Sequence, residues 1–214
     1  MKIKEERKKV VEYGKKLIES GLTTGTGGNL SIYNADKGLM AISPSGMDYF
    51  EIEVEDVLVM DLKGNIIEGN KKPSSEYAMH SIFYRNREDV RAVVHTHSIY
   101  STTIATLNWE IEPVHYLVAF AGKKVPCADY ATYGTEKLAE NAYSAMQDEY
   151  NATLLANHGL LAVGNNMATA FATAEEIEFC AEVLYRTKAI GDPVVLPEEE
   201  MELMMEKFKS YGQR

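Results

Sequence analysis

The chain has 214 residues, of which 45% are hydrophobic and 25% charged, and its formal net charge is −10. These proportions are typical of globular proteins and exclude a disordered or fibrous chain, and a chain of this length can bury a full core. The acidic balance argues against a nucleic-acid partner, because phosphate backbones are bound mainly by clustered Lys and Arg. We expect one domain over residues 1–214, with any phosphorylated ligand small and locally bound.

The two cysteines, Cys127 and Cys180, lie 53 positions apart and have no CxxC spacing. Neither a disulfide framework nor a cysteine zinc site is therefore expected. The basic N-terminus is not followed by an apolar signal-peptide core, and no run of about 18 apolar residues occurs. These features predict a cytoplasmic chain with no membrane partner.

In chain order, apolar residues at helical spacing predict a first helix that ends near Ser20, where Gly21 follows as a C′ glycine. A glycine-rich loop at 24–29 then leads into a short strand at 30–33. This order excludes a dinucleotide fingerprint and a P-loop, because both need a strand before the loop and a helix after it.

Further strands are expected at 39–42, 57–60, 66–67 and 92–96, and as two short strands within 153–164. Further helices are expected after the Pro-Ser-Ser-Glu segment at 73–76, where the serines suit N-capping, and at 101–107, 135–146, 167–189 and from 197. Hairpin signals alternate with helices, so we predict a single-domain α/β fold. Its form is an α-β-α sandwich with a mixed, largely antiparallel central sheet flanked by helices.

Three histidines point to a metal site. His95 and His97 are two positions apart on a predicted strand, so both imidazoles leave the same face and can bind one cation. His158 lies in a tight Asn-His-Gly corner between two apolar strands. Three histidines with an open fourth position are typical of a catalytic metal. The alternative, which we would prefer for any lone histidine, is that they are core or surface residues with ordinary partners.

Glu76 is the acid–base candidate, because it opens a helix behind two serines and a proline. Its ordinary alternative is a first-turn glutamate that complements the helix dipole or forms a capping box. Three small polar loops, at 27–29, 45–46 and 74–75, could supply N–H and hydroxyl donors to an oxyanion, although each alone is typical of a turn. His80 is interpreted as a packed or hydrogen-bonded helix residue, and Tyr116 as a general acid or a core aromatic.

Taken together, these segments resemble the class II aldolase and adducin family along nearly the whole chain, most closely its L-fuculose phosphate aldolase branch. The resemblance is carried by the segments 25–31, 43–46, 72–76, 94–97, 157–160 and 206–212. It implies that His95, His97 and His158 bind one Zn²⁺ per subunit and that Glu76 is the acid/base. It further implies a phosphate site formed by Gly28, Asn29, Ser45, Gly46, Ser74 and Ser75.

The resemblance also implies that Tyr116 and Tyr211 reach the aldehyde side of a neighbouring subunit's site, in a homotetramer with active sites at its interfaces. Tyr133 stands where the family has Phe, and it would line the aldehyde pocket. The metal is open among zinc, manganese, cobalt and iron.

The implied reaction is zinc-dependent cleavage of L-fuculose 1-phosphate to glycerone phosphate and L-lactaldehyde through a metal-bound enediolate. One alternative is an aldolase for another ketose 1-phosphate, such as a 5-deoxypentulose 1-phosphate. Another is L-ribulose 5-phosphate 4-epimerase, although the additional acid/base pair of that enzyme is not found. The third is a non-catalytic, adducin-like binding module, against which the intact histidines and Glu76 argue.

Overall fold

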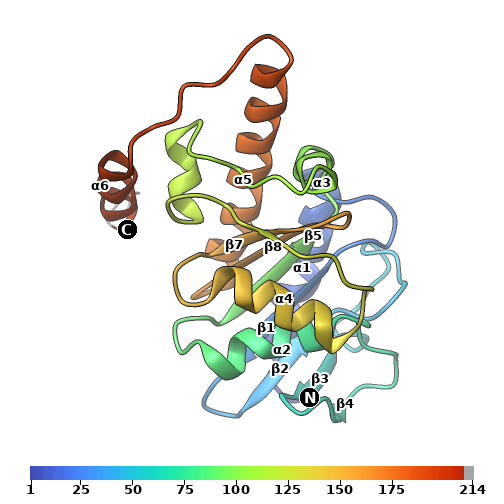
Figure 1. Cartoon of the computed structure of the whole chain (residues 1–214). Helices are drawn as coiled ribbons and strands as arrows, with labels where there is room; N and C mark the ends of the chain where they lie inside the picture. The colour runs from blue at the N-terminus through green and yellow to red at the C-terminus, as the bar shows by residue number, and fades with distance from the viewer. Residues whose placement is uncertain (210–214) are drawn as a thin grey trace.

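Eight strands form one sheet in the computed structural model, which describes residues 1–209 (Figure 1). The strands are β1 (Asn29–Asn34), β2 (Leu39–Ile42), β3 (Leu58–Asp61), β4 (Ile66–Glu68), β5 (Ala92–Thr96), β6 (Cys127–Ala128), β7 (Ala152–Leu155) and β8 (Gly159–Gly164). Their order is β4-β3-β2-β1-β5-β8-β7-β6. The β6–β7 pair is parallel and the other pairs are antiparallel, which confirms the mixed, largely antiparallel sheet.

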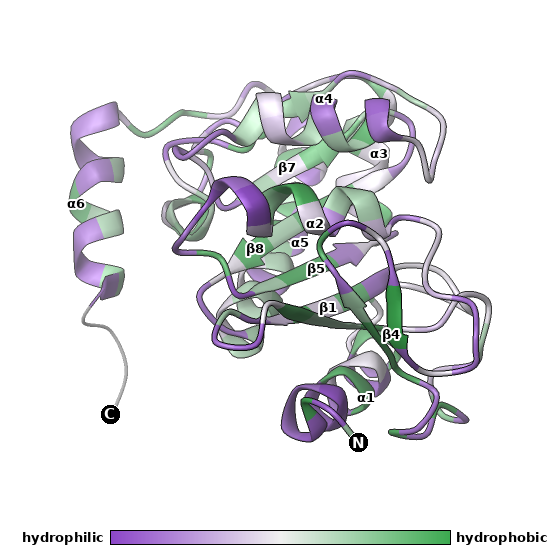
Figure 2. Ribbon diagram, turned by 90° about the horizontal axis from the view of Figure 1, so that it is seen from below, coloured by the Kyte–Doolittle hydropathy of each residue, from purple (hydrophilic) through white to green (hydrophobic). Residues whose placement is uncertain are grey.

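Helices cover both faces of this sheet (Figure 1). They are α1 (Lys4–Glu19), α2 (Tyr77–Asn86), α3 (Ile99–Thr106), the 3₁₀ helix η1 (Tyr116–Phe120), α4 (Glu136–Met146), α5 (Met167–Lys188) and α6 (Glu198–Lys209). α1, α3 and α5 pack on one face, and α2 and α4 pack on the other. α6 stands away from the sheet (Figure 2). It packs against η1. The predicted α-β-α sandwich is confirmed.

Strand alternation divides the buried side chains into two cores. Val94 of β5 belongs to the core beneath α1 and α5, whereas its neighbour Val93 belongs to the core beneath α2 and α4. Because side chains along a strand alternate between faces, His95 leaves β5 on the same side as Val93. The predicted histidine site therefore lies on the face of the sheet that α2 and α4 cover.

α1 ends just before Gly21, as the sequence predicted. Gly21 has a φ of 69°, and its N–H donates to the carbonyl of Ile18 at 3.0 Å. The N–H of Leu22 donates to the carbonyl of Leu17, also at 3.0 Å, and both leucine side chains are buried. This pair of bonds is the Schellman motif, which turns the chain from α1 into the glycine-rich loop.

Some local predictions were wrong. The cap of α2 is not a serine but Glu76, whose side chain makes no capping hydrogen bond. The 3₁₀ helix η1 and the two-residue strand β6 were not predicted. Over the described residues 1–209, no helix combines the length and the apolar character needed to cross a membrane.

Candidate metal centre and active site

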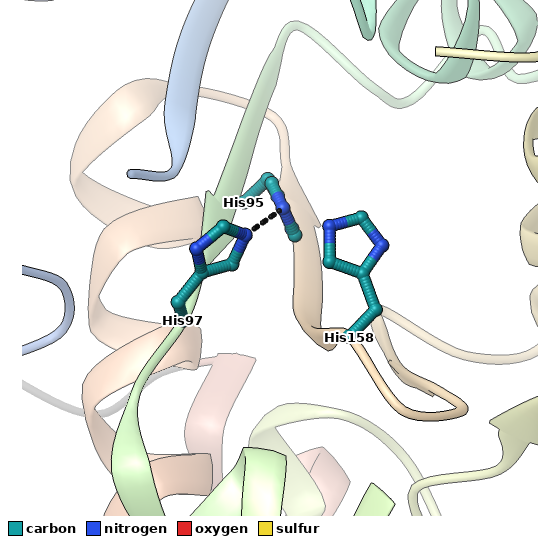
Figure 3. Close-up of side chains that lie close together, drawn as sticks. All are labelled: His95, His97 and His158. Atoms are coloured by element: carbon teal, nitrogen blue, oxygen red, sulfur yellow. Dashed lines mark hydrogen bonds between the residues drawn. The ribbon is translucent and has the colours of Figure 1, made fainter. Parts of the chain in front are cut away.

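Three imidazole rings converge at the end of β5 (Figure 3). His95 is in β5, His97 follows its last residue, and His158 lies in the turn between β7 and β8. One nitrogen from each ring lies within 4.8 Å of the others. The two-residue spacing and the predicted corner therefore bring all three histidines together, as expected for ligands of one ion.

Glycine and asparagine allow the backbone to approach this closely. Asn157 turns the β7–β8 hairpin with a φ of 55°, a left-handed conformation that Asn tolerates better than most residues. Gly28 has a φ of 69°, and a Cβ there would lie 2.6 Å from the carbonyl oxygen of His95. Only glycine lets the loop before β1 lie directly against β5.

Hydrogen bonding sets the tautomer of His95. Its Nδ1 lies 2.9 Å from the main-chain carbonyl of Leu160, which can only accept, so Nδ1 carries the proton. Burial, with the nearby His158 and His97, holds the pKa of His95 well below its usual value, so the ring is neutral. Nε2 therefore presents a lone pair, and it lies 3.0 Å from Nε2 of His97. In metal-binding histidines, the ring nitrogen that does not bind the metal typically donates a hydrogen bond in this way.

The carboxylate of Glu76 completes the cluster. Its Oε2 accepts a hydrogen bond from Nδ2 of Asn29 at 2.9 Å and lies 3.3 Å from Nε2 of His95. Its Oε1 is buried, lies 3.6 Å from Nε2 of His158, and has no hydrogen-bond partner among residues 1–209. A buried, unsatisfied carboxylate oxygen is costly. Beside three neutral imidazoles it fits a divalent cation, so the residues present suit a metal.

The pKa values of the other two histidines also favour metal binding. Burial lowers the pKa of His97 and that of His158 below the ordinary imidazole value. Both rings are thus neutral near pH 7, and a neutral imidazole is the form that binds metal.

A cavity of about 390 Å³ opens beside the cluster. It is lined by Glu76, His97 and His158 and by all seven predicted substrate-binding residues: Gly28, Asn29, Ser45, Gly46, Ser74, Ser75 and Tyr133. Main-chain hydrogen bonds join the loop that contains Ser45 to the loop that contains Ser74. The N–H of Ser45 donates to the carbonyl of Lys72 at 2.9 Å, and the N–H of Ser74 donates to the carbonyl of Ser43 at 3.1 Å. Two of the three polar loops predicted separately are therefore held side by side, and all three line the cavity.

The predicted tyrosines are placed differently from one another. Tyr133 lines the cavity, whereas Tyr116 lies on η1, is 46% exposed, and is not among the lining residues. Tyr211 lies outside the described residues. The structure adds Tyr130, which also lines the cavity and which the sequence analysis missed. Both tyrosines lie in the loop between β6 and α4, and sharing that loop with Tyr133 was the available signal.

His80 is more closely connected to the site than its sequence neighbours suggested. It is fully buried, as expected for a packed and hydrogen-bonded residue. Its Nε2 lies 2.5 Å from Oδ1 of Asn29, the residue whose Nδ2 holds Glu76. The side-chain amide of Asn29 thus links Glu76, the predicted acid/base, to His80, which lies one helical turn further along the chain.

Comparison with known proteins gives the same family throughout. Residues 8–185 match the model of the class II aldolase and adducin N-terminal domain. The chain is 57% identical over 214 residues to a 5-deoxy-D-ribulose 1-phosphate aldolase of Bacillus thuringiensis serovar kurstaki, and the match covers 100% of both chains. It is 39% identical to an L-fuculose phosphate aldolase of Escherichia coli K12, over 97% of this chain and 95% of that one.

A solved structure described as an L-fuculose 1-phosphate aldolase superposes with a TM-score of 0.93 at 52% identity, covering 96% of each chain. These relatives match nearly their full length, and the solved structure shares the fold. The chain therefore belongs to the class II aldolase and adducin family and, like these relatives, is an aldolase, a lyase that cleaves carbon–carbon bonds.

Proposed function

We propose that this protein cleaves a ketose 1-phosphate to glycerone phosphate and a short aldehyde, with one Zn²⁺ per subunit bound by His95, His97 and His158. The observation that carries this proposal is the unsatisfied Oε1 of Glu76, buried 3.6 Å from Nε2 of His158 beside the cavity. A carboxylate at that position can bind the metal and can exchange a proton with a reacting carbon. We infer that residues 1–214 act as one domain.

The phosphate would be bound by neutral donors. Ser45 and Gly46 on one loop and Ser74 and Ser75 on the other line the cavity, and the second loop directly precedes α2. Helix N-termini favour anions because their N–H groups are free and the dipole is positive there. Over the described residues no Lys or Arg lines the cavity, so these N–H and hydroxyl groups would provide the main phosphate contacts.

Glu76 would exchange the proton at C3. A bound divalent metal would supply Lewis-acid stabilisation of the negative charge that develops when the C3–C4 bond breaks. In the cleavage direction the C4 hydroxyl would lose its proton to solvent through a tyrosine as the C3–C4 bond breaks, and Glu76, protonated from solvent, would deliver a proton to C3; each such proton transfer contributes about 10² to 10⁴ in rate. Tyr116 and Tyr211 of a neighbouring subunit are our candidates, which requires an oligomer with active sites at its interfaces, and we propose a homotetramer.

We propose 5-deoxy-D-ribulose 1-phosphate as the preferred substrate. The support is the 57% identity, over the whole of both chains, to the relative described as acting on that sugar, against 39% for the fuculose enzyme of E. coli. Cleavage between C3 and C4 of 5-deoxy-D-ribulose 1-phosphate gives glycerone phosphate and acetaldehyde.

L-Fuculose 1-phosphate is the second candidate, because the 52% identical solved structure is described as an L-fuculose 1-phosphate aldolase. Both sugars give glycerone phosphate, and they differ only in the aldehyde, acetaldehyde or L-lactaldehyde. Where the contacts are apolar, one additional hydroxyl-bearing carbon in the aldehyde changes transition-state binding by only about 1–3 kcal/mol, and hydrogen-bonding groups discriminate more strongly. Tyr130 and Tyr133, which are exposed and line the cavity, are our candidates for making that distinction.

The test is glycerone phosphate release from each sugar by zinc-loaded protein, followed with a coupled reductase. We expect a higher kcat/KM for 5-deoxy-D-ribulose 1-phosphate, and a changed ratio between the two sugars in Tyr133→Phe. A higher kcat/KM for L-fuculose 1-phosphate would favour the second candidate. Release from neither sugar, together with interconversion of L-ribulose 5-phosphate and D-xylulose 5-phosphate, would favour the epimerase instead.

A further inference from the structure

Two rows of polar side chains meet between α2 and β1. Glu76 at the cap of α2 is followed at four-residue intervals by His80 and Tyr84, a rise of about 6 Å per step. Asn29 and Ser31 are two residues apart on β1, a rise of about 6.6 Å. Because these steps nearly match, the two rows stay aligned, and all five side chains are buried.

The hydrogen bonds along these rows have one consistent direction. Glu76 Oε2 accepts from Nδ2 of Asn29, so Oδ1 of that amide faces away from the carboxylate. His80 Nε2 lies 2.5 Å from this oxygen, which can only accept, and the ring must therefore carry its proton on Nε2. On the other side of the ring, Nδ1 lies 2.6 Å from the hydroxyl of Ser31 and accepts from it.

The far end of the row is also satisfied. The hydroxyl of Tyr84 lies 2.6 Å from Oγ of Ser31 and 3.0 Å from the Ser31 main-chain carbonyl. Because the Ser31 proton is directed to His80, the Tyr84 hydroxyl is the donor to both of these oxygens. His80 thus has a partner on each ring nitrogen and no contact with solvent. Burial lowers the pKa of His80 to about 3, which leaves the ring neutral and in one tautomer.

We propose that His80 is a positioning residue that fixes the amide of Asn29 and, through it, the carboxylate of Glu76. This inference rests on the proposed function of Glu76 as the acid/base. Without a donor from His80, Oδ1 of Asn29 is a buried acceptor without a partner, so the amide is no longer held at both ends and turns toward other donors. Its hydrogen bond to Oε2 of Glu76 is then weakened or lost, and Glu76 would move away from its place between the histidines and the cavity.

Two variants separate this role from general packing. In His80→Gln the amide nitrogen reaches the position of Nε2 and can still donate to Asn29. In His80→Asn the shorter side chain reaches only toward Ser31 and leaves Oδ1 of Asn29 without a partner. Phe83→Leu is the matched control, because Phe83 is buried in α2 but packs against Tyr143 rather than into the row.

The first readout is kinetic, on zinc-loaded protein with glycerone phosphate release as the assay. We expect kcat of His80→Asn to fall about 10²-fold, the usual effect of a misplacement near 1 Å, with KM within about twofold of the wild type. We expect His80→Gln to recover most of this loss, and Phe83→Leu to lower stability without lowering kcat. Wild-type kcat in His80→Asn, or equal loss in all three variants, would overturn the proposal.

The second readout does not depend on activity. Nitrogen-15 NMR of the histidine rings should show His80 protonated on Nε2, and the Asn29 side-chain amide resonances should shift in His80→Asn but not in Phe83→Leu. A proton on Nδ1, or unchanged Asn29 resonances, would overturn the positioning role. If the wild-type protein releases no glycerone phosphate, the proposed function fails, and these resonances alone decide whether His80 orients Asn29.

Discussion

The Oε1 atom of Glu76 lies 3.6 Å from Nε2 of His158 and is buried without a hydrogen-bond partner among residues 1–209. The other carboxylate oxygen is held by Asn29. One oxygen is therefore fixed and the other is free to act, which is the arrangement expected of a group that serves a metal or moves a proton.

Glu76→Gln tests that arrangement. The amide keeps the shape of the side chain but cannot exchange a proton, so we expect kcat to fall by about 10² to 10⁴ while the three histidines still bind zinc. Glycerone phosphate release and metal analysis of the same sample measure both quantities. Glu88→Gln, at an exposed position just after α2, is the control and should retain full activity. Wild-type turnover in zinc-bound Glu76→Gln would contradict the assignment of the base.

Gly28→Ala tests the close approach of the loop to β5. Gly25 and Gly28 both have positive φ, at 60° and 69°, so an alanine at either position costs about 1–2 kcal/mol of backbone strain. Only at Gly28 would the new methyl meet a backbone atom, the carbonyl oxygen of His95 at 2.6 Å. We expect Gly28→Ala to lower the free energy of unfolding further than Gly25→Ala and also to weaken zinc binding. Urea denaturation and zinc titration measure this, and equal effects in both variants would argue against it.

His80 also predicts a pH dependence of stability. Its pKa is lowered by burial from an ordinary 6.5 to about 3, so between these values the unfolded chain binds a proton that the folded chain does not. The free energy of unfolding therefore falls as the pH falls below 6.5, by about 1.4 kcal/mol per pH unit for this one group.

In metal-free protein, His80→Gln should lose the contribution of His80. Its free energy of unfolding should therefore fall less steeply with falling pH than that of the wild type. Glu76 and the three clustered histidines near His80 are present in both proteins, so their titration largely cancels in the difference. Urea denaturation at several pH values between 4 and 7 measures it. Parallel curves for the two proteins would show that His80 is protonated in the folded state or already neutral in the unfolded one.

Local patterns were sufficient for much of the fold. Strand 92–96 was predicted with its observed limits, because Val93, Val94 and Thr96 are β-branched residues that favour a buried strand. The pairing of His95 with His97 followed from the two-residue period alone. The strand β6 has only two residues and η1 only five, too few to show a period, so neither could be found this way.

Contacts between distant segments could not be derived from local patterns. Asn29 and His80 are 51 positions apart, and their contact depends on how α2 lies across β1. The sequence therefore suggested a phosphate role for Asn29, which stays a prediction, and no link to Glu76. The serine cap expected for α2 failed at the same place, since Glu76 occupies the cap position with its side chain turned toward the histidines. Local rules are broken most often where function sets the geometry.

The measurement that tests the central claim most directly is glycerone phosphate release from 5-deoxy-D-ribulose 1-phosphate as zinc is returned to chelator-stripped protein. We predict that release is lost on stripping and rises in proportion to bound zinc, to a maximum at one ion per chain. His97→Ala, which removes one of the three imidazoles, should bind zinc weakly and stay inactive. Full turnover by stripped protein, or activity unrelated to bound metal, would contradict a metal-dependent aldolase built on these three histidines.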